Sequence, residues 1–173
     1  MRLIFSLADQ TDVPALAALH TAASAELTRQ YGQGIWTSVA TERGVLFHMR
    51  HAKVVIARHS KNIVGTLNLQ TKKPWAIDVS YFTPVKRAIY LTGMAVLPSA
   101  QGKGIGKALL EEAAKQVRAW PADAIRLDAW DADAGAGEFY RKCGFRETGR
   151  VIYRKSPLIY LERLLLQEEA NQP

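Results

Sequence analysis

Cysteine is almost absent from the sequence, and long apolar runs are absent altogether. The one cysteine is Cys143, so no internal disulfide can form and nothing indicates an oxidising compartment. No stretch approaches the roughly 20 apolar residues of a membrane-spanning helix, and the apolar run at residues 1–6 is too short for a signal peptide. We therefore expect a cytoplasmic protein without a membrane partner.

The charged residues are predominantly basic, with 23 Lys and Arg against 16 Asp and Glu and a formal net charge of +7. They are dispersed along the chain, without the long runs that are typical of a nucleic-acid-binding arm. A polyanionic small-molecule ligand explains the excess as well as a solubilising surface does. We expect no nucleic-acid partner.

The spacing of apolar and β-branched residues predicts alternating strands and helices within one domain, residues 1–173. Strands are expected at 3–7, 53–58, 63–70, 88–97, 125–130, 145–153 and 158–166. Helices are expected from about residue 13 to a break at 30–34, and at about 35–50, 105–120 and 136–142. The polar tail 167–173 is expected to fray. This order predicts an α+β fold with a mixed, mostly antiparallel sheet of about seven strands and helices on both faces.

A glycine-rich turn, residues 101–106, stands between the strand expected at 88–97 and the helix that follows it. A helix N-terminus presents unpaired amides, and glycines let an anion approach the backbone closely, so this turn predicts a phosphate site. Neither the dinucleotide fingerprint nor the P-loop fits, because other residues occupy their required glycine and Ser/Thr positions. A glycine-rich turn without a ligand is the alternative.

The pattern Gln-x-x-Gly-x-Gly at Gln101, Gly104 and Gly106 fits another signature. Here the sequence resembles the GNAT acetyltransferase superfamily, whose pyrophosphate-binding signature is Arg/Gln-x-x-Gly-x-Gly/Ala. A second block, 127–145, is similar to the family's other signature, in which a strand precedes a short helix with Phe/Leu-Tyr and then Gly-Phe. The two blocks cover roughly residues 88–150.

The resemblance implies an enzyme that moves the acetyl group of acetyl-CoA to a primary amine by direct attack in a ternary complex. It implies a sheet that splays at the cofactor site, where an amide near Met94 or Ala95 stabilises the oxyanion. The implied cofactor-binding residues are Met94, Ala95, Val96, Gln101, Gly102, Lys103, Gly104, Ile105, Gly106, Lys107 and Asp133. Many members have asparagine where Asp133 stands, so Asp133 capping the short helix is the alternative.

The reaction needs one residue that gives a proton to the departing thiolate and a base that takes one from the amine. The resemblance implies Tyr140 as the general acid toward the departing thiolate, with a core tyrosine as the alternative. The general base is open: Tyr90 and Asp128 are candidates, and so is a water chain. By period two, Tyr90 is expected to share one strand face with Met94 and Val96.

The acceptor is expected to be a small-molecule or peptide amine. Aromatic candidates for its pocket are Tyr31, Trp36, Tyr81 and Trp130, although any of them could be a core residue. The histidines lack metal-ligand spacing, so no metal is expected. Cys143 is expected to be a small buried side chain that fills space in a packed turn. Alternatives are a longer acyl-CoA donor, a hydroxyl acceptor or a CoA-sensing module without turnover. The chain is expected to be a monomer or homodimer.

Overall fold

The computed structural model describes residues 2–165 of the chain. The strands are β1 (Ile4–Leu7), β2 (Lys53–His59), β3 (Asn62–Gln70), β4 (Ala88–Val96), β5 (Ala124–Trp130), β6 (Arg146–Tyr153) and β7 (Ser156–Leu164). The helices are α1 (Val13–Tyr31), α2 (Glu42–His51), α3 (Ile105–Arg118) and α4 (Gly137–Lys142). The expected tail at 167–173 and the end of the last predicted strand at residue 166 lie outside the described residues.

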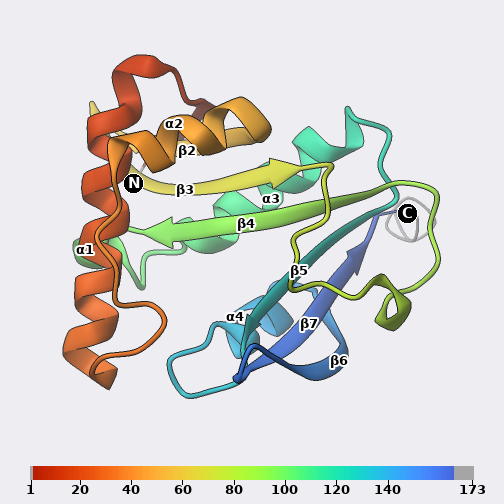
Figure 1. The fold of residues 1–173 in the computed structure, drawn as a ribbon. Helices are drawn as coiled ribbons and strands as arrows, with labels where there is room; N and C mark the ends of the chain where they lie inside the picture. Colours follow the sequence, from red (N-terminus) through yellow and green to blue (C-terminus); the bar gives the residue numbers. More distant parts are fainter. Residues whose placement is uncertain (1, 166–173) are drawn as a thin grey trace. The chain divides into compact units, whose positions relative to one another are not determined.

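One seven-stranded sheet carries the fold, with the strand order β1-β2-β3-β4-β5-β7-β6 (Figure 1). The β1–β2, β2–β3, β5–β7 and β6–β7 pairs are antiparallel, whereas β4 and β5 run parallel, with Ala88 opposite Ala124. The mixed, mostly antiparallel sheet predicted from the sequence is therefore confirmed. The splaying expected beside the cofactor site stays a prediction.

The chain divides into two compact units. The first comprises the described parts of Met1–Gln70 and Thr92–Ala113, and the second comprises those of Thr71–Leu91 and Ala114–Pro173. β4 and α3 contribute to both units. The single domain expected over 1–173 stays a prediction.

The first unit is built on both faces of β2 and β3. On one face, Leu16 of α1 and Val45 of α2 are buried in a core with Ile56 of β2. On the other face, a Cβ atom at Gly65 would lie 2.8 Å from Cδ1 of Leu109, so α3 packs directly on the β3 backbone. The expected arrangement of helices on both faces thus holds within this unit.

The second predicted helix begins later than expected, at Glu42 instead of residue 35. Thr41 caps it, because its Oγ1 accepts a hydrogen bond from the amide of Gly44 at 3.1 Å. In the segment before it, side chains bind the backbone: the amide of Ser38 donates to Oγ of Ser24 at 3.0 Å. Such local bonds compete with the helical pattern.

The second unit has its own apolar cluster, in which Ile77, Phe82 and Tyr90 pack around Tyr160 of β7. The Tyr160 hydroxyl donates to the carbonyl of Ala76 and accepts from the amide of Asp78 at 3.1 Å. One buried tyrosine therefore fixes the long segment between β3 and β4 to the sheet of this unit.

Candidate active site

The end of β4 in the first unit has an irregular backbone. Gly93 has a φ of +56°, which interrupts the regular alternation of the strand. Beyond it, Ala95 and Leu97 pack against the core of the first unit. The expectation that Tyr90, Met94 and Val96 share one strand face relied on regular alternation, which Gly93 interrupts. Sequence reasoning missed the neighbour of Gly93, Asn68, a buried polar residue within the apolar strand β3.

The glycine turn is open where the sequence predicts a phosphate. Gly102 and Gly104 have φ values of +73° and +77°, and a Cβ atom at either position would meet nothing within 4 Å. Both residues are exposed. The backbone is therefore accessible on this side, as close contact with an anion requires.

Free amide groups follow at the start of α3. The helical hydrogen bond from Ala108 to the carbonyl of Gly104 measures 3.0 Å, so the amides of Ile105, Gly106 and Lys107 precede the bonded turns of the helix. The side chain of Ile105 is only 1 % exposed, which anchors this end of the helix in the core of the first unit.

Side chains of the turn fold back on its own backbone. Nε2 of Gln101 donates to the carbonyl of Val96 at 3.2 Å, and Nζ of Lys103 donates to the carbonyl of Ser99 at 3.0 Å. Gln101 thereby ties the turn to the last residue of β4. The first unit thus brings the implied cofactor residues from Met94 to Lys107 together.

Tyr140 and Asp128 lie within the second unit. Tyr140 of α4 is 7 % exposed, and burial, followed by the charge of Asp128, raises its pKa far above the ordinary range. Burial also raises the pKa of Asp128 on β5. A phenol that keeps its proton beside a carboxyl that readily accepts one can serve acid and base chemistry.

Tyr90 has a different environment. It is 6 % exposed and belongs to the apolar cluster with Ile77, Phe82 and Tyr160. Such packing supports a structural tyrosine, so Asp128 is the better supported base candidate of the two.

Asp133 is exposed and does not cap the short helix, which corrects the alternative raised from the sequence. The N-cap of α4 is Ala136, without a side-chain hydrogen bond, so the helix begins too far along the chain for Asp133 to cap it. A contact between Asp133 and the cofactor stays a prediction.

The aromatic acceptor candidates fall into two pairs. Tyr31 and Trp36 belong to the first unit, where Nε1 of Trp36 donates to the carbonyl of Gly32 at 3.0 Å. Tyr81 and Trp130 belong to the second, where the ring centroids of Tyr81 and Tyr160 lie 5.5 Å apart. Each pair retains exposed aromatic surface, since Tyr31 and Tyr81 are 45 % and 44 % exposed.

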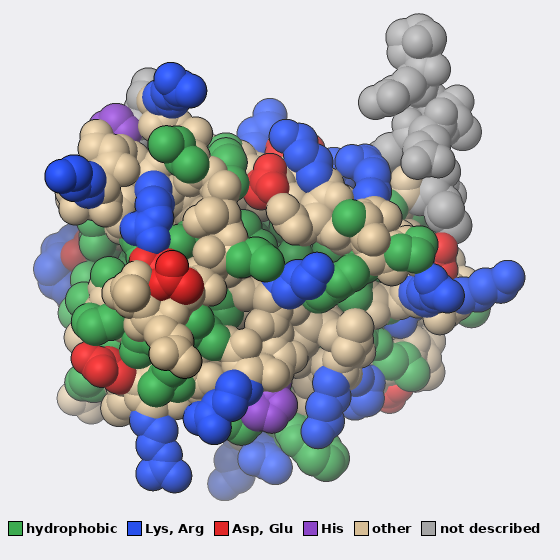
Figure 2. Space-filling view, turned by 90° about the horizontal axis from the view of Figure 1, so that it is seen from above, with side chains coloured by type: hydrophobic (Ala, Val, Ile, Leu, Met, Phe, Trp, Pro, Cys, Tyr) green, Lys and Arg blue, Asp and Glu red, His purple; other side chains and the backbone are tan. Residues whose placement is uncertain are grey.

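The histidines and the cysteine lie outside this candidate site. Burial is the main cause that lowers the pKa values of His20 and His48. Among residues 2–165, no three His, Cys, Asp or Glu side chains are grouped to hold a metal, and Cys143 is buried. No helix in this range has the length and apolarity to cross a membrane. On the face seen in Figure 2, Lys and Arg side chains are dispersed.

Known proteins share both this fold and part of this sequence. An aminoglycoside N(6′)-acetyltransferase type 1 of Stenotrophomonas maltophilia is 41 % identical over 73 residues, which are 40 % of this chain and 45 % of that protein. The match thus spans less than half the length of this curated relative.

Two solved structures match along nearly their whole length. A PaiA N-acetyltransferase of Thermoplasma acidophilum, in complex with coenzyme A, has a TM-score of 0.74 at 15 % identity, covering 95 % of this chain and 99 % of that one. A ribosomal-protein-alanine N-acetyltransferase of Brucella melitensis has a TM-score of 0.72 at 20 % identity, covering 94 % and 99 %. The model of the acetyltransferase (GNAT) family matches residues 18–145, and this chain therefore belongs to that family.

Proposed function

We propose that this protein transfers the acetyl group of acetyl-CoA to a primary amine by direct attack in a ternary complex. The observation that carries the proposal is the open turn at Gly102 and Gly104, followed by the free amides at the start of α3. A coenzyme A pyrophosphate is an anion of the kind that such a helix start binds. Membership of the family supports the same donor.

In the proposed complex the end of β4 and the glycine turn hold the donor. The amide of Gln101 donates to the carbonyl of Pro98 at 3.2 Å, so Gln101 acts in the proposal through the side chain that orders the turn. The amides from Gly102 to Lys107 bind the pyrophosphate, and Lys103 and Lys107 add positive charge. An amide near Met94 or Ala95 donates to the thioester oxygen, which becomes an oxyanion during attack. Asp133 is retained in the proposal as a further contact to the donor.

Tyr140 and Asp128 carry the proton transfers of the proposal. The neutral amine attacks the thioester carbon, the carbon–sulfur bond breaks, and Tyr140 gives its proton to the departing thiolate. The proton lost by the amine goes to Asp128, directly or through water. Because an ionised Asp128 raises the pKa of Tyr140, protonation of Asp128 makes the release of the Tyr140 proton easier.

The acceptor in this proposal is a small amine or a peptide amine. The curated relative that matches is named for an aminoglycoside, and the Brucella protein is named for the alanine of a ribosomal protein. Tyr31, Trp36, Tyr81 and Trp130 are the proposed aromatic contacts. A cytoplasmic location and a monomer or homodimer belong to the same proposal.

A thiol-release assay with acetyl-CoA tests the proposal directly. The acceptor panel contains an aminoglycoside, a polyamine, an alanine-ended peptide and a hydroxyl analogue of each, with mass spectrometry of the products. Amine-dependent release and an acetylated amine are expected. Faster release with propionyl- or succinyl-CoA indicates a longer acyl donor, and calorimetric binding without release indicates a CoA-sensing module. Absence of binding to any CoA species contradicts the proposal.

A further inference from the structure

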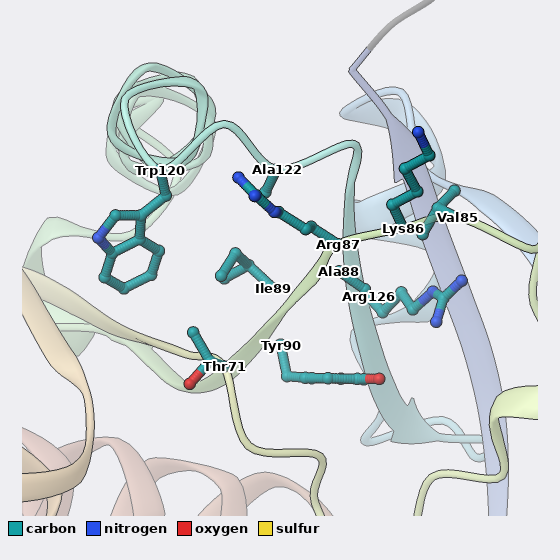
Figure 3. A pocket seen from close by; sticks show the side chains of 10 residues that line it. All are labelled: Thr71, Val85, Lys86, Arg87, Ala88, Ile89, Tyr90, Trp120, Ala122 and Arg126. Atoms are coloured by element: carbon teal, nitrogen blue, oxygen red, sulfur yellow. The ribbon is translucent and has the colours of Figure 1, made fainter.

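A cleft of about 530 Å³ opens in the second unit, at the start of β4 (Figure 3). Its lining comes from the beginnings of β4 and β5, the segment before β4 and the residues after α3. These residues have no part in the proposed acetyl transfer. The volume lies within the range of small-molecule sites in proteins.

The cleft carries unbalanced positive charge. None of its ten lining residues is acidic, and three are basic: Lys86, Arg87 and Arg126. Arg126 is already neutralised, because its Nε lies 3.2 Å from Oε2 of the fully buried Glu162. Lys86 and Arg87 are exposed, and within residues 2–165 neither side chain has an ion-pair partner.

The acidic residue near Arg87 is Asp123, and its carboxylate already binds a backbone amide. Oδ2 of Asp123 accepts the amide hydrogen of Arg87 at 2.9 Å, and the carbonyl of Arg87 accepts the amide hydrogen of Asp123 at 2.9 Å. These two bonds fix the backbone at the mouth of the cleft. The guanidinium group of Arg87 is left for another anion.

An apolar surface stands beside this guanidinium group. Figure 3 shows the side chain of Arg87 extending toward Trp120, with Ile89 below the guanidinium group in this view, whereas Lys86 points away from both. Ile89 and Ala122 are 3 % and 7 % exposed and form a solid floor. The half-buried indole ring of Trp120 provides a flat wall.

We propose that Arg87, Ile89, Trp120 and Ala122 form a binding site for a small anion with a flat apolar body, of the aromatic carboxylate class. The guanidinium fork of Arg87 matches the two oxygens of a carboxylate. The indole of Trp120 and the side chain of Ile89 cover the ring of the ligand. The site is independent of the proposed acetyl transfer, so either can fail without the other.

The test is calorimetric titration of the full chain with 2-naphthoate, and with 2-naphthamide and acetate as matched probes. Binding of one naphthoate is expected, with the uncharged amide and the ringless acetate each at least about tenfold weaker. Equal affinity for naphthamide overturns the proposal, as does the absence of naphthoate binding. The titration is repeated with saturating CoA, and complete displacement by CoA also overturns it, because the probe then binds elsewhere.

Paired variants test where in the cleft the ligand binds. Arg87→Gln and Lys86→Gln each remove one charge from the cleft, but only Arg87→Gln is expected to weaken naphthoate, by about tenfold. Arg87→Lys keeps the charge and loses the fork, so it should recover part of that affinity. Trp120→Ala should also weaken binding. Equal weakening by the Arg87 and Lys86 variants would show a diffuse charge effect and overturn the site.

Discussion

A Cβ atom at Gly93 would lie 2.6 Å from Nδ2 of Asn68. Asn68 is only 4 % exposed, and Gly93 has a φ of +56°, so both crowding and backbone conformation exclude a side chain there. Asn68 of the neighbouring strand β3 thus fixes the irregular backbone that precedes the amides of Met94 and Ala95.

Gly93→Ala is expected to lower the free energy of unfolding by about 2–4 kcal/mol, because it adds left-handed strain to the contact with Asn68. Urea denaturation measures the loss. In an Asn68→Ala background the contact is gone and only the strain persists, so the same substitution should cost less. Strict additivity of the two substitutions would show that the contact carries no energy.

Gly104→Ala is expected to weaken CoA binding by about tenfold or more, because the added methyl group enters the space proposed for the pyrophosphate. Gly32→Ala is a matched control: its φ of +78° is close to the +77° of Gly104, and its Cβ also meets nothing within 4 Å. Both variants should lose similar stability in thermal melts. Equal CoA affinity in the two, by calorimetry, contradicts the proposed binding turn.

Tyr140→Phe is expected to reduce kcat by about 100-fold or more, since the departing thiolate loses its proton donor. The affinity for acetyl-CoA should change little, because the phenyl ring preserves the packing in the second unit. Stopped-flow thiol release separates the chemical step from product release. Tyr90→Phe, which removes the hydroxyl of another buried tyrosine, should have a much smaller effect. An unchanged chemical step in Tyr140→Phe would exclude the acid role.

Asp128→Asn is expected to give a more stable but slower protein. The folded-state pKa of Asp128 lies above its ordinary value of 3.8, so the folded state binds this proton more tightly than the unfolded state. Stability therefore falls as pH rises from the ordinary pKa through the raised one, and the ionised carboxylate is unfavourable at neutral pH. The Tm of Asp128→Asn should exceed that of the parent at pH 7 but match it at pH 3. Loss of the acidic limb from the pH–rate profile would identify Asp128 as the base.

Glu162→Gln is expected to cost about 3–5 kcal/mol of unfolding free energy, because it leaves Arg126 buried without an opposing charge. Oε1 of Glu162 lies 3.3 Å from the guanidinium of Arg146, and its side chain is fully buried. Glu138→Gln makes the same chemical change in an exposed ion pair with Arg141 and should change stability little. Urea denaturation of both variants compares the two, and similar losses would contradict the role of burial.

Local patterns predicted most of the elements closely. The last strands and α4 lie within a few residues of their expected bounds, and Gly144, with a φ of +85°, follows the end of α4. The start of α2 was misplaced because hydrogen bonds from Ser24, in another helix, hold the preceding segment. Such a partner is invisible to local periodicity.

The sequence by itself determined the turn at Gly102 and Gly104, because glycine spacing and the following amphipathic helix express a local backbone requirement. It also named Tyr140 through a family resemblance, whereas Asp128 was one of several open candidates for the base. Only the tertiary structure decided that Asn68 leaves no room for a side chain at Gly93 and that the side chain of Arg87 extends toward Trp120. These relationships join residues far apart in the chain, and burial and charge pairing exist only after folding brings them together.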